Sequence, residues 1–171
     1  MPLYTQNIFK RRIQPMTNEV EQIEKVSTMI DAFSTSFGSA RAAIYSFPKL
    51  QEHTQFTRFL NSFLTLLRRA NCRPVYSWNY DSNRERYNFI LIVNGYFRND
   101  VQDITDAAQR IWSNYSPEQI SFIADIPVKL DTLTSDKQHV LDALYQSSFF
   151  PNEPQRILNL HQRAFACSRL F

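Results

Sequence analysis

The chain has 171 residues, of which 43% are hydrophobic and 14% aromatic, so it can bury the core of one ordinary globular domain. Two glycines and no G-x-x-x-x-G-K or G-x-G-x-x-G motif argue against nucleotide hydrolysis and dinucleotide chemistry. The two cysteines, Cys72 and Cys167, form no C-x-x-C pair, which favours free thiols in a reducing compartment over a zinc site.

The net charge of +3 is unevenly distributed along the chain. Residues 1–17 form a basic arm with no acidic residue, and residues 151–171 form a second basic stretch, whereas residues 18–150 between them are slightly acidic. We therefore predict one α+β domain over 18–150 with basic ends that contact a polyanion. The alternative is that the terminal charges only keep the tails solvated.

The first half of the domain alternates helical and extended patterns. Apolar residues at spacings of three and four predict a helix over 18–37 that Gly38 ends. "RAAIYSF" (41–47), closed by Pro48, predicts a strand, and the next apolar stripe predicts a helix from 56 to about 71. "RPVYSWNY" (73–80) alternates with period two, and the polar stretch 81–85 then turns the chain into a hairpin.

The second half continues in the same way. The returning strand lies in "RERYNFILIVNGYF" (84–97), and a helix follows over 99–112. "QISFIADI" (119–126) predicts a fourth strand ended by Pro127, and a last helix is predicted over 136–150. The resulting order, β-α-β-β-α-β, predicts a ferredoxin-like, RRM-like antiparallel sheet with two helices on one face and the other face open.

Several of these segments resemble, in order and spacing, the inovirus replication initiators of the YagK/YfjJ group. "AAIYSFPKL" is similar to the first strand of that family, "FTRFLNSFLTLLRR" to its long helix, and "PVYSWNYDSNRERYNFILIVNGYF" to its hairpin. "IWSNY" and "RAFACSRLF" resemble two later motifs. The resemblance spans roughly residues 20–171 and implies a rolling-circle endonuclease scaffold of the HUH type, which carries paired histidines on a central strand.

The same resemblance implies that the catalytic groups are missing. Arg86 and Asn88 stand at the positions of the two metal-binding histidines, and Phe149 stands at that of the nucleophilic tyrosine, with Asn152 in place of the lysine after it. Arginine does not lose its proton and phenylalanine has no hydroxyl, so neither metal binding nor covalent attack is expected. Tyr145, one helical turn earlier, is the alternative nucleophile; packing is the alternative role for it.

We therefore expect no enzyme activity and no cofactor or metal, but a cytoplasmic DNA-binding protein of a phage or prophage, acting as a regulator or accessory factor. A phage-encoded module that inhibits a host defence or replication protein through the open sheet face is the alternative, and homodimer formation stays open. No membrane contact is expected. The predicted nucleic-acid-binding residues are Lys10, Arg11, Arg12, Tyr76, Trp78, Arg84, Arg86, Asn88, Arg163 and Arg169.

Some of these residues have a second interpretation. Tyr76, Trp78 and Tyr80 share one strand face and serve either as core or as a stacking platform for bases. Arg84 and Arg86 either contact phosphates or lie in a solvated turn with Glu85 as a partner. The three histidines, His53, His139 and His161, are too scattered in the sequence to indicate a site.

Overall fold

The structure is a computed structural model that describes residues 15–70, 72–94, 101–150 and 165–167. The basic arm, most of the C-terminal stretch and the predicted contacts Lys10, Arg11, Arg12, Arg163 and Arg169 lie outside the described residues. In chain order the elements are α2 (Pro15–Phe37), β1 (Ser39–Pro48), α3 (Thr54–Arg69), β2 (Val75–Asp81), β3 (Arg86–Asn94), α4 (Val101–Trp112), β4 (Ser121–Lys129), the 3-10 turn η1 (Leu130–Thr132), α5 (Leu133–Gln146) and β5 (Phe165–Cys167).

The strands form one sheet in the order β4-β1-β3-β2-β5. Every neighbouring pair is antiparallel, and the register places Ser46 beside Asn88 and Asn88 beside Asn79. The prediction of an α+β protein with an antiparallel sheet is confirmed. The short strand β5, which pairs with the outer edge of β2, was not predicted and lies within the stretch that we had assigned to a separate basic extension.

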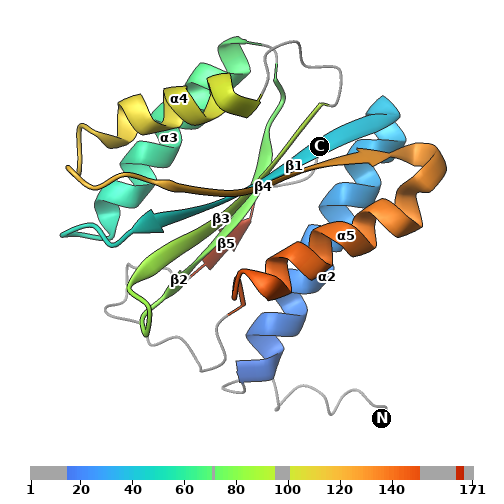
Figure 1. Ribbon diagram of the computed structural model, residues 1–171, viewed down its shortest axis with the longest axis horizontal. Coiled ribbons are helices and arrows are strands. Elements are labelled where there is room, and N and C mark those ends of the chain that lie inside the picture. Colours follow the sequence, from blue (N-terminus) through green and yellow to red (C-terminus); the bar gives the residue numbers. More distant parts are fainter. Residues whose placement is uncertain (1–14, 71, 95–100, 151–164, 168–171) are drawn as a thin grey trace.

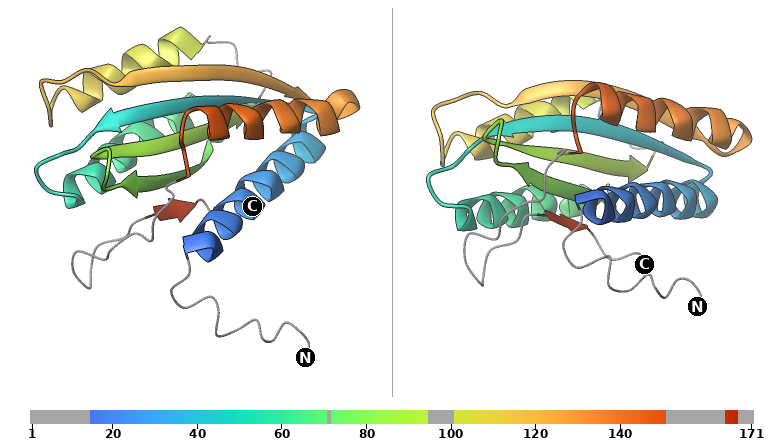
Figure 2. Two further views of the ribbon diagram at one scale, coloured as in Figure 1. Left: turned by 60° about the horizontal axis from the view of Figure 1, so that its bottom comes forward. Right: turned by 90° about the horizontal axis from the view of Figure 1, so that it is seen from below.

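Helices lie on both faces of the sheet (Figures 1 and 2). α3 and α4 cover one face, which we call the aromatic face, and α2 and α5 cover the other, which we call the aliphatic face. The prediction of an open sheet face is therefore wrong. The physical reason is visible in β3, whose residues from Tyr87 to Val93 are buried without interruption, because a strand covered on both sides has no solvent-facing positions.

The two faces are packed with side chains of different size. The aromatic face is built from stacked and edge-on rings, for example Phe56 on Tyr87 with ring centroids 4.1 Å apart. The aliphatic face carries the small side chains of Ala40 and Ala42 under α2. These short side chains allow α2 to approach closely, and Cα atoms of the helix come within 8 Å of Cα atoms in β1 and β3.

Several element boundaries differ from the predicted ones; α2, for example, begins at Pro15 rather than at residue 18. Gly38 ends α2 as expected, with φ 75° and its N–H donating to the Ser34 carbonyl at 2.7 Å. β4, however, continues through Pro127 to Lys129, because a proline is tolerated in an edge strand. α5 runs over 133–146 rather than 136–150. None of the helices in the described part of the chain combines the length and the apolar character needed to cross a membrane.

Candidate functional site

The predicted site residues Arg86 and Asn88 lie on β3 and project from the aliphatic face at the hairpin end of the sheet. Residues two apart on a strand share a face, and Ile90 and Ile92, which continue this series, belong to the core under α2 and α5. Asn79 lies beside Asn88 on β2, and Phe149 reaches the same place from the end of α5. Residues 79, 88 and 149 are therefore brought together by three different segments.

A buried amide network joins these residues, and we call it the asparagine network: Gln22, Asn79, Asn88 and the Phe149 carbonyl. The Asn88 Nδ2 donates to Asn79 Oδ1 at 2.8 Å and to the Phe149 carbonyl at 3.1 Å. The Asn79 Nδ2 donates to Gln22 Oε1 and to the same carbonyl, both at 2.8 Å. Because all three side chains are buried, each hydrogen bond offsets a desolvation cost that no water can relieve.

The carbonyl of Phe149 is placed by the way in which α5 ends. The Phe149 N–H donates to the Leu144 carbonyl at 2.9 Å and the Ser148 N–H to the Tyr145 carbonyl at 3.1 Å, which is the pattern of a Schellman motif. Ser148 occupies the left-handed position, with φ 58°, where glycine is usual. The ring of Phe149 packs into the same core as Leu144, an apolar contact that often accompanies this motif.

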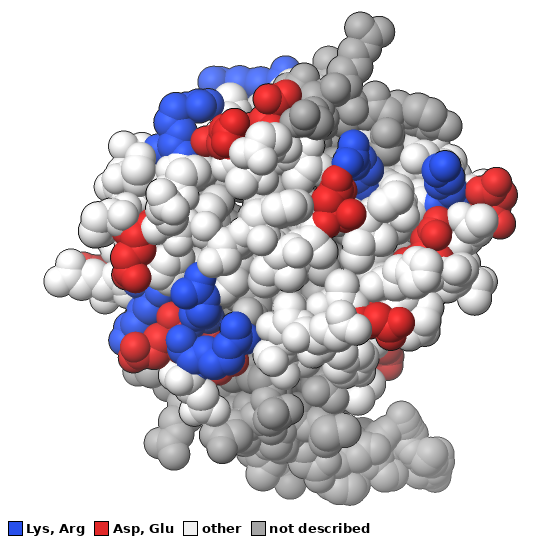
Figure 3. Space-filling model, viewed as in Figure 1, with Lys and Arg blue, Asp and Glu red and all other residues white. Residues whose placement is uncertain are grey.

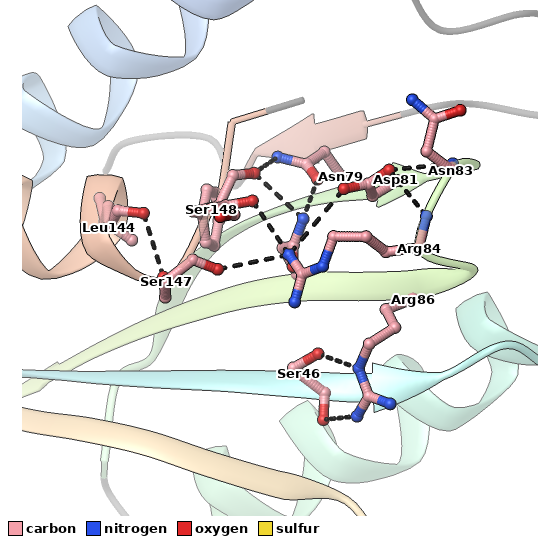
Figure 4. A network of polar contacts seen from close by, with 11 residues as sticks. Ser46, Asn79, Asp81, Asn83, Arg84, Arg86, Leu144, Ser147 and Ser148 are labelled. Atoms are coloured by element: carbon pink, nitrogen blue, oxygen red, sulfur yellow. Dashed lines mark hydrogen bonds and ion pairs between the residues drawn. The ribbon is translucent and has the colours of Figure 1, made fainter. Parts of the chain in front are cut away.

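Arg84 ties the hairpin turn to this helix end (Figure 4). Its Nη1 donates to the Ser147 carbonyl at 3.3 Å and to the Ser148 carbonyl at 3.2 Å. A cation at these carbonyls is also favoured by the negative end of the α5 dipole. Asp81 lies 3.9 Å from the Arg84 Nη1 and accepts the N–H groups of Asn83 and Arg84, so it shapes the turn as well.

Arg86 points the other way along the sheet, across β1 (Figure 4). Its Nε donates to Ser46 Oγ, and its Nη2 donates to the Ser46 carbonyl and to Ser121 Oγ, both at 3.2 Å. These acceptors are all neutral, and in the described part of the chain no carboxylate lies within ion-pair distance of Arg86. Burial lowers the pKa of Arg86, the charge on Arg84 lowers it further, and Glu118 acts in the opposite direction.

Positive charge gathers at this end of the molecule. Figure 3 shows Lys and Arg side chains at the lower left, over the hairpin end of β2 and β3, with acidic side chains among them. Lys49 contributes there and pairs with Glu85 at 3.8 Å. The predicted local partner of the hairpin arginines, Glu85, is therefore engaged by a lysine instead. We call Lys49, Arg84 and Arg86 the hairpin cluster.

The predicted aromatic contacts belong to the core. Trp78 is 6% exposed and packs edge-on against Phe56, with ring centroids 4.9 Å apart, and Tyr76 packs on the same cluster under α3. For Trp78 the core interpretation therefore holds and the stacking interpretation is corrected, whereas Tyr76 is half-buried at the edge of this core. Asn88, at 2% exposure, is likewise closed off from a nucleic acid, since its donors are used inside the asparagine network.

The structure also shows where groups that could bind a metal ion or act as a nucleophile lie. Within the described residues, no three His, Cys, Asp or Glu side chains come together in a way that could hold a metal ion. Tyr145 lies on the exposed side of α5, with 53% of its surface accessible, and its ring contacts Phe150. The structure shows no hydrogen bond from Tyr145 to Asn79 or Asn88.

Sequence reasoning missed Gln22, Ser46 and Ser121 as members of this region, and it missed a histidine contact on the aromatic face. His53 Nδ1 and Tyr87 Oη lie 2.6 Å apart at the start of α3. Burial and then the nearby Lys49 lower the pKa of His53, and burial raises the pKa of Tyr87. The only sequence signal for this pair was the position of Tyr87 on a buried strand face, which says nothing about its partner.

Comparisons with known proteins add no relative to this geometry. A scan against protein-family models, a search of curated proteins and a search of solved structures each returned no match.

Proposed function

We propose that the protein binds DNA on the scaffold of a rolling-circle replication initiator that has lost the ability to cut, and that it serves a phage or prophage as a regulator or accessory factor. The single observation that carries this proposal is the contact between Asn88 and Phe149. These residues are 61 positions apart, and the resemblance assigns them to a metal ligand and to the nucleophile, which must meet in any such enzyme. Their hydrogen bond supports that assignment.

The strand order gives a second, independent argument. β4-β1-β3-β2, with all neighbours antiparallel, is the order of the split β-α-β arrangement on which the resemblance depends. The proposal adds to this arrangement the covering helices α2 and α5 and the edge strand β5. A ferredoxin-like sheet of HUH type thus remains our interpretation of the fold.

The proposed loss of cutting follows from the chemistry of the three replaced side chains. A guanidinium stays protonated and repels a cation, and a neutral amide is a weak ligand. The ring of Phe149 offers no oxygen with which to form an ester to DNA. What the hairpin retains is positive charge, because it carries both Arg84 and Arg86, and the charge on Arg84 helps to lower the pKa of Arg86.

Two arginines at one hairpin suit a phosphate, because Arg86 is held by neutral acceptors and Arg84, which lies 3.9 Å from Asp81, is still 40% exposed. An anion would relieve the repulsion between the guanidinium groups, and the forked donors of arginine match phosphate oxygens. Ser46 and Ser121 fix the Arg86 side chain in place, so less side-chain entropy is lost on binding. The mechanism that we propose is therefore phosphate contact by the hairpin cluster, with the aromatic residues taking no part.

The test is fluorescence anisotropy with labelled single-stranded and duplex oligonucleotides of about 30 nucleotides, measured across a salt series. If Arg84 and Arg86 each contact one phosphate, then Arg84→Gln with Arg86→Gln should lower the slope of log K against log salt by about 1.8 on duplex or about 1.4 on single strand. The matched control is Arg69→Gln with Arg110→Gln, which removes the same charge from the opposite helical layer.

An equal decrease of the salt slope in the control pair would reject the hairpin cluster as the binding site. Absence of binding at low salt would reject DNA binding as the function. Thermal unfolding of each variant checks that it is folded. Arg86→Lys, which keeps the charge but loses the fork, should weaken binding without changing the slope.

A second candidate function is a protein-interaction module directed against a host protein. The sheet face first considered for this role is covered by α2 and α5, so such a partner would need another surface. A groove between α3 and α4 provides one.

A further inference from the structure

The outer side of the α3–α4 layer carries a groove of about 560 Å³ that the DNA-binding proposal does not use. It follows α3 from residue 61 to residue 69, a length of about 12 Å. Leu66 and Ile111 supply its apolar surface, and Arg69 and Arg110 contribute one guanidinium from each helix. Of the described residues that line it, none is acidic.

The two arginines lack partners of opposite charge. In the described part of the chain, neither Arg69 nor Arg110 forms an ion pair. Asp106, one turn before Arg110 on α4, accepts a hydrogen bond from Gln102 at 2.7 Å instead. Figure 3 shows basic side chains over this layer at the upper left, with acidic ones beside them. The charge inside the groove is thus positive, although its surroundings are mixed.

The apolar surface of the groove is also more exposed than the other large apolar side chains of α3. Leu66 is 38% exposed on a helix whose other large apolar side chains, such as Phe59, Phe63 and Leu67, are buried against the sheet. A leucine between polar neighbours on the solvent side contributes nothing to the core. It does provide apolar area to a partner that covers it.

The form of the partner follows from the backbone. Both walls of the groove are helices, and carbonyls of their last turns accept hydrogen bonds from Ala70, Cys72, Ser113 and Asn114, so the groove presents mainly side chains. An extended peptide lying there would leave its own backbone groups without partners, whereas a helix satisfies them itself. A third helix resting between two others is also an ordinary packing arrangement.

From these observations we propose that the α3–α4 groove is a docking site for an acidic amphipathic helix of a partner protein. Apolar residues of that helix cover Leu66 and Ile111, and carboxylates flanking them pair with Arg69 and Arg110. This surface lies on the aromatic side of the sheet, whereas Arg86 projects from the aliphatic side, so the proposal does not depend on DNA binding.

The test is selection from a displayed library of random peptides about 16 residues long, panned against the full chain. Peptides are counter-selected on the double charge reversal Arg69→Glu with Arg110→Glu. We expect enriched sequences with leucine-type residues three and four apart and flanking Asp or Glu. The charge reversal should weaken their binding at least tenfold in anisotropy titrations.

The matched control is Lys49→Glu with Arg84→Glu, an equal charge reversal at the hairpin cluster. We expect it to leave peptide binding unchanged while weakening DNA binding, and the groove variant to behave in the opposite way. Chemical-shift changes on peptide addition should concentrate at residues 61–69 and 110–111. Enrichment of basic or extended peptides, no enrichment, an oligonucleotide bound at these residues, or equal loss in both variants would overturn the proposal.

Discussion

The asparagine network leads to a specific prediction, because replacing one side-chain NH2 group by an oxygen turns a hydrogen-bond donor into an acceptor. Asn88 donates both of its hydrogen bonds from Nδ2, to Asn79 Oδ1 and to the Phe149 carbonyl. Asn88→Asp keeps the shape but places an oxygen between two oxygen acceptors, in a site with 2% exposure. A buried charge without a partner costs about 3–5 kcal/mol, and we expect the free energy of unfolding at pH 7 to fall by that amount.

The sign of the pH dependence follows from the same geometry. Burial and two facing acceptors would raise the folded-state pKa of an aspartic acid at this position above its usual value of about 3.9. The folded state then binds a proton that the unfolded state has released, so the variant is most impaired at neutral pH. As the pH falls from this raised folded-state pKa towards about 4, the deficit should shrink, because a protonated carboxyl can donate to one of the two acceptors.

The assay is urea unfolding of wild type and variant between pH 4 and pH 8, with Asn114→Asp as the exposed control. Asn114 lies at the surface beyond α4, and a charge there should change stability by no more than about 0.5 kcal/mol. Hydrogen exchange should also show faster exchange at the Phe149 amide, which closes the end of α5. A loss below about 1 kcal/mol at pH 7, or a deficit independent of pH, would refute the buried network.

Three further predictions follow from particular residues. Ser148→Gly should raise the free energy of unfolding by about 0.5–1 kcal/mol, since Ser148 has φ 58°, whereas Ser147→Gly, at φ −87°, should lower it; urea unfolding compares the two. The lowered pKa of His53 means that the unfolded chain takes up a proton first as the pH falls through about 6.5, so stability should decrease there, and His53→Gln should flatten that part of the stability profile. Trp78→Ala should cost about 3–5 kcal/mol in thermal or urea unfolding but leave the salt slope of DNA binding unchanged; a reduced slope in a folded variant would return the residue to the interface.

Local patterns were sufficient to predict the order of helices and strands from α2 to α5, because the helices carry apolar stripes at spacings of three and four and the strands are short apolar or alternating runs between turn residues. These patterns did not predict that helices also cover the second face of the sheet. The run from Phe89 to Val93 on β3 is apolar at every position, and that signal of two-sided burial was outweighed by the open sheet of the fold first considered. The three residues of β5 are too few for any pattern to predict.

The candidate site shows the same limit. That Arg86 and Asn88 share a face follows from strand geometry alone, and their burial then depends on which helix covers them. Gln22 enters the network from a helix 57 residues before Asn79, and no local pattern links the two. Trp78 illustrates a different case, since the sequence favoured a core role but left a stacking role open, and the position of α3 decides between them.

Because side chains of different size pack the two faces of the sheet, the two faces should be sensitive to different substitutions. Over the aromatic face, where rings fill a wide space, the harmful substitutions are those that remove volume. Under α2, substitutions that add volume at Ala40 or Ala42 are harmful as well, since a larger side chain there would push the helix outward and displace Gln22 from Asn79. Random substitutions should therefore destabilise the aromatic face mainly by creating cavities, and the aliphatic face also by overpacking at the two alanines.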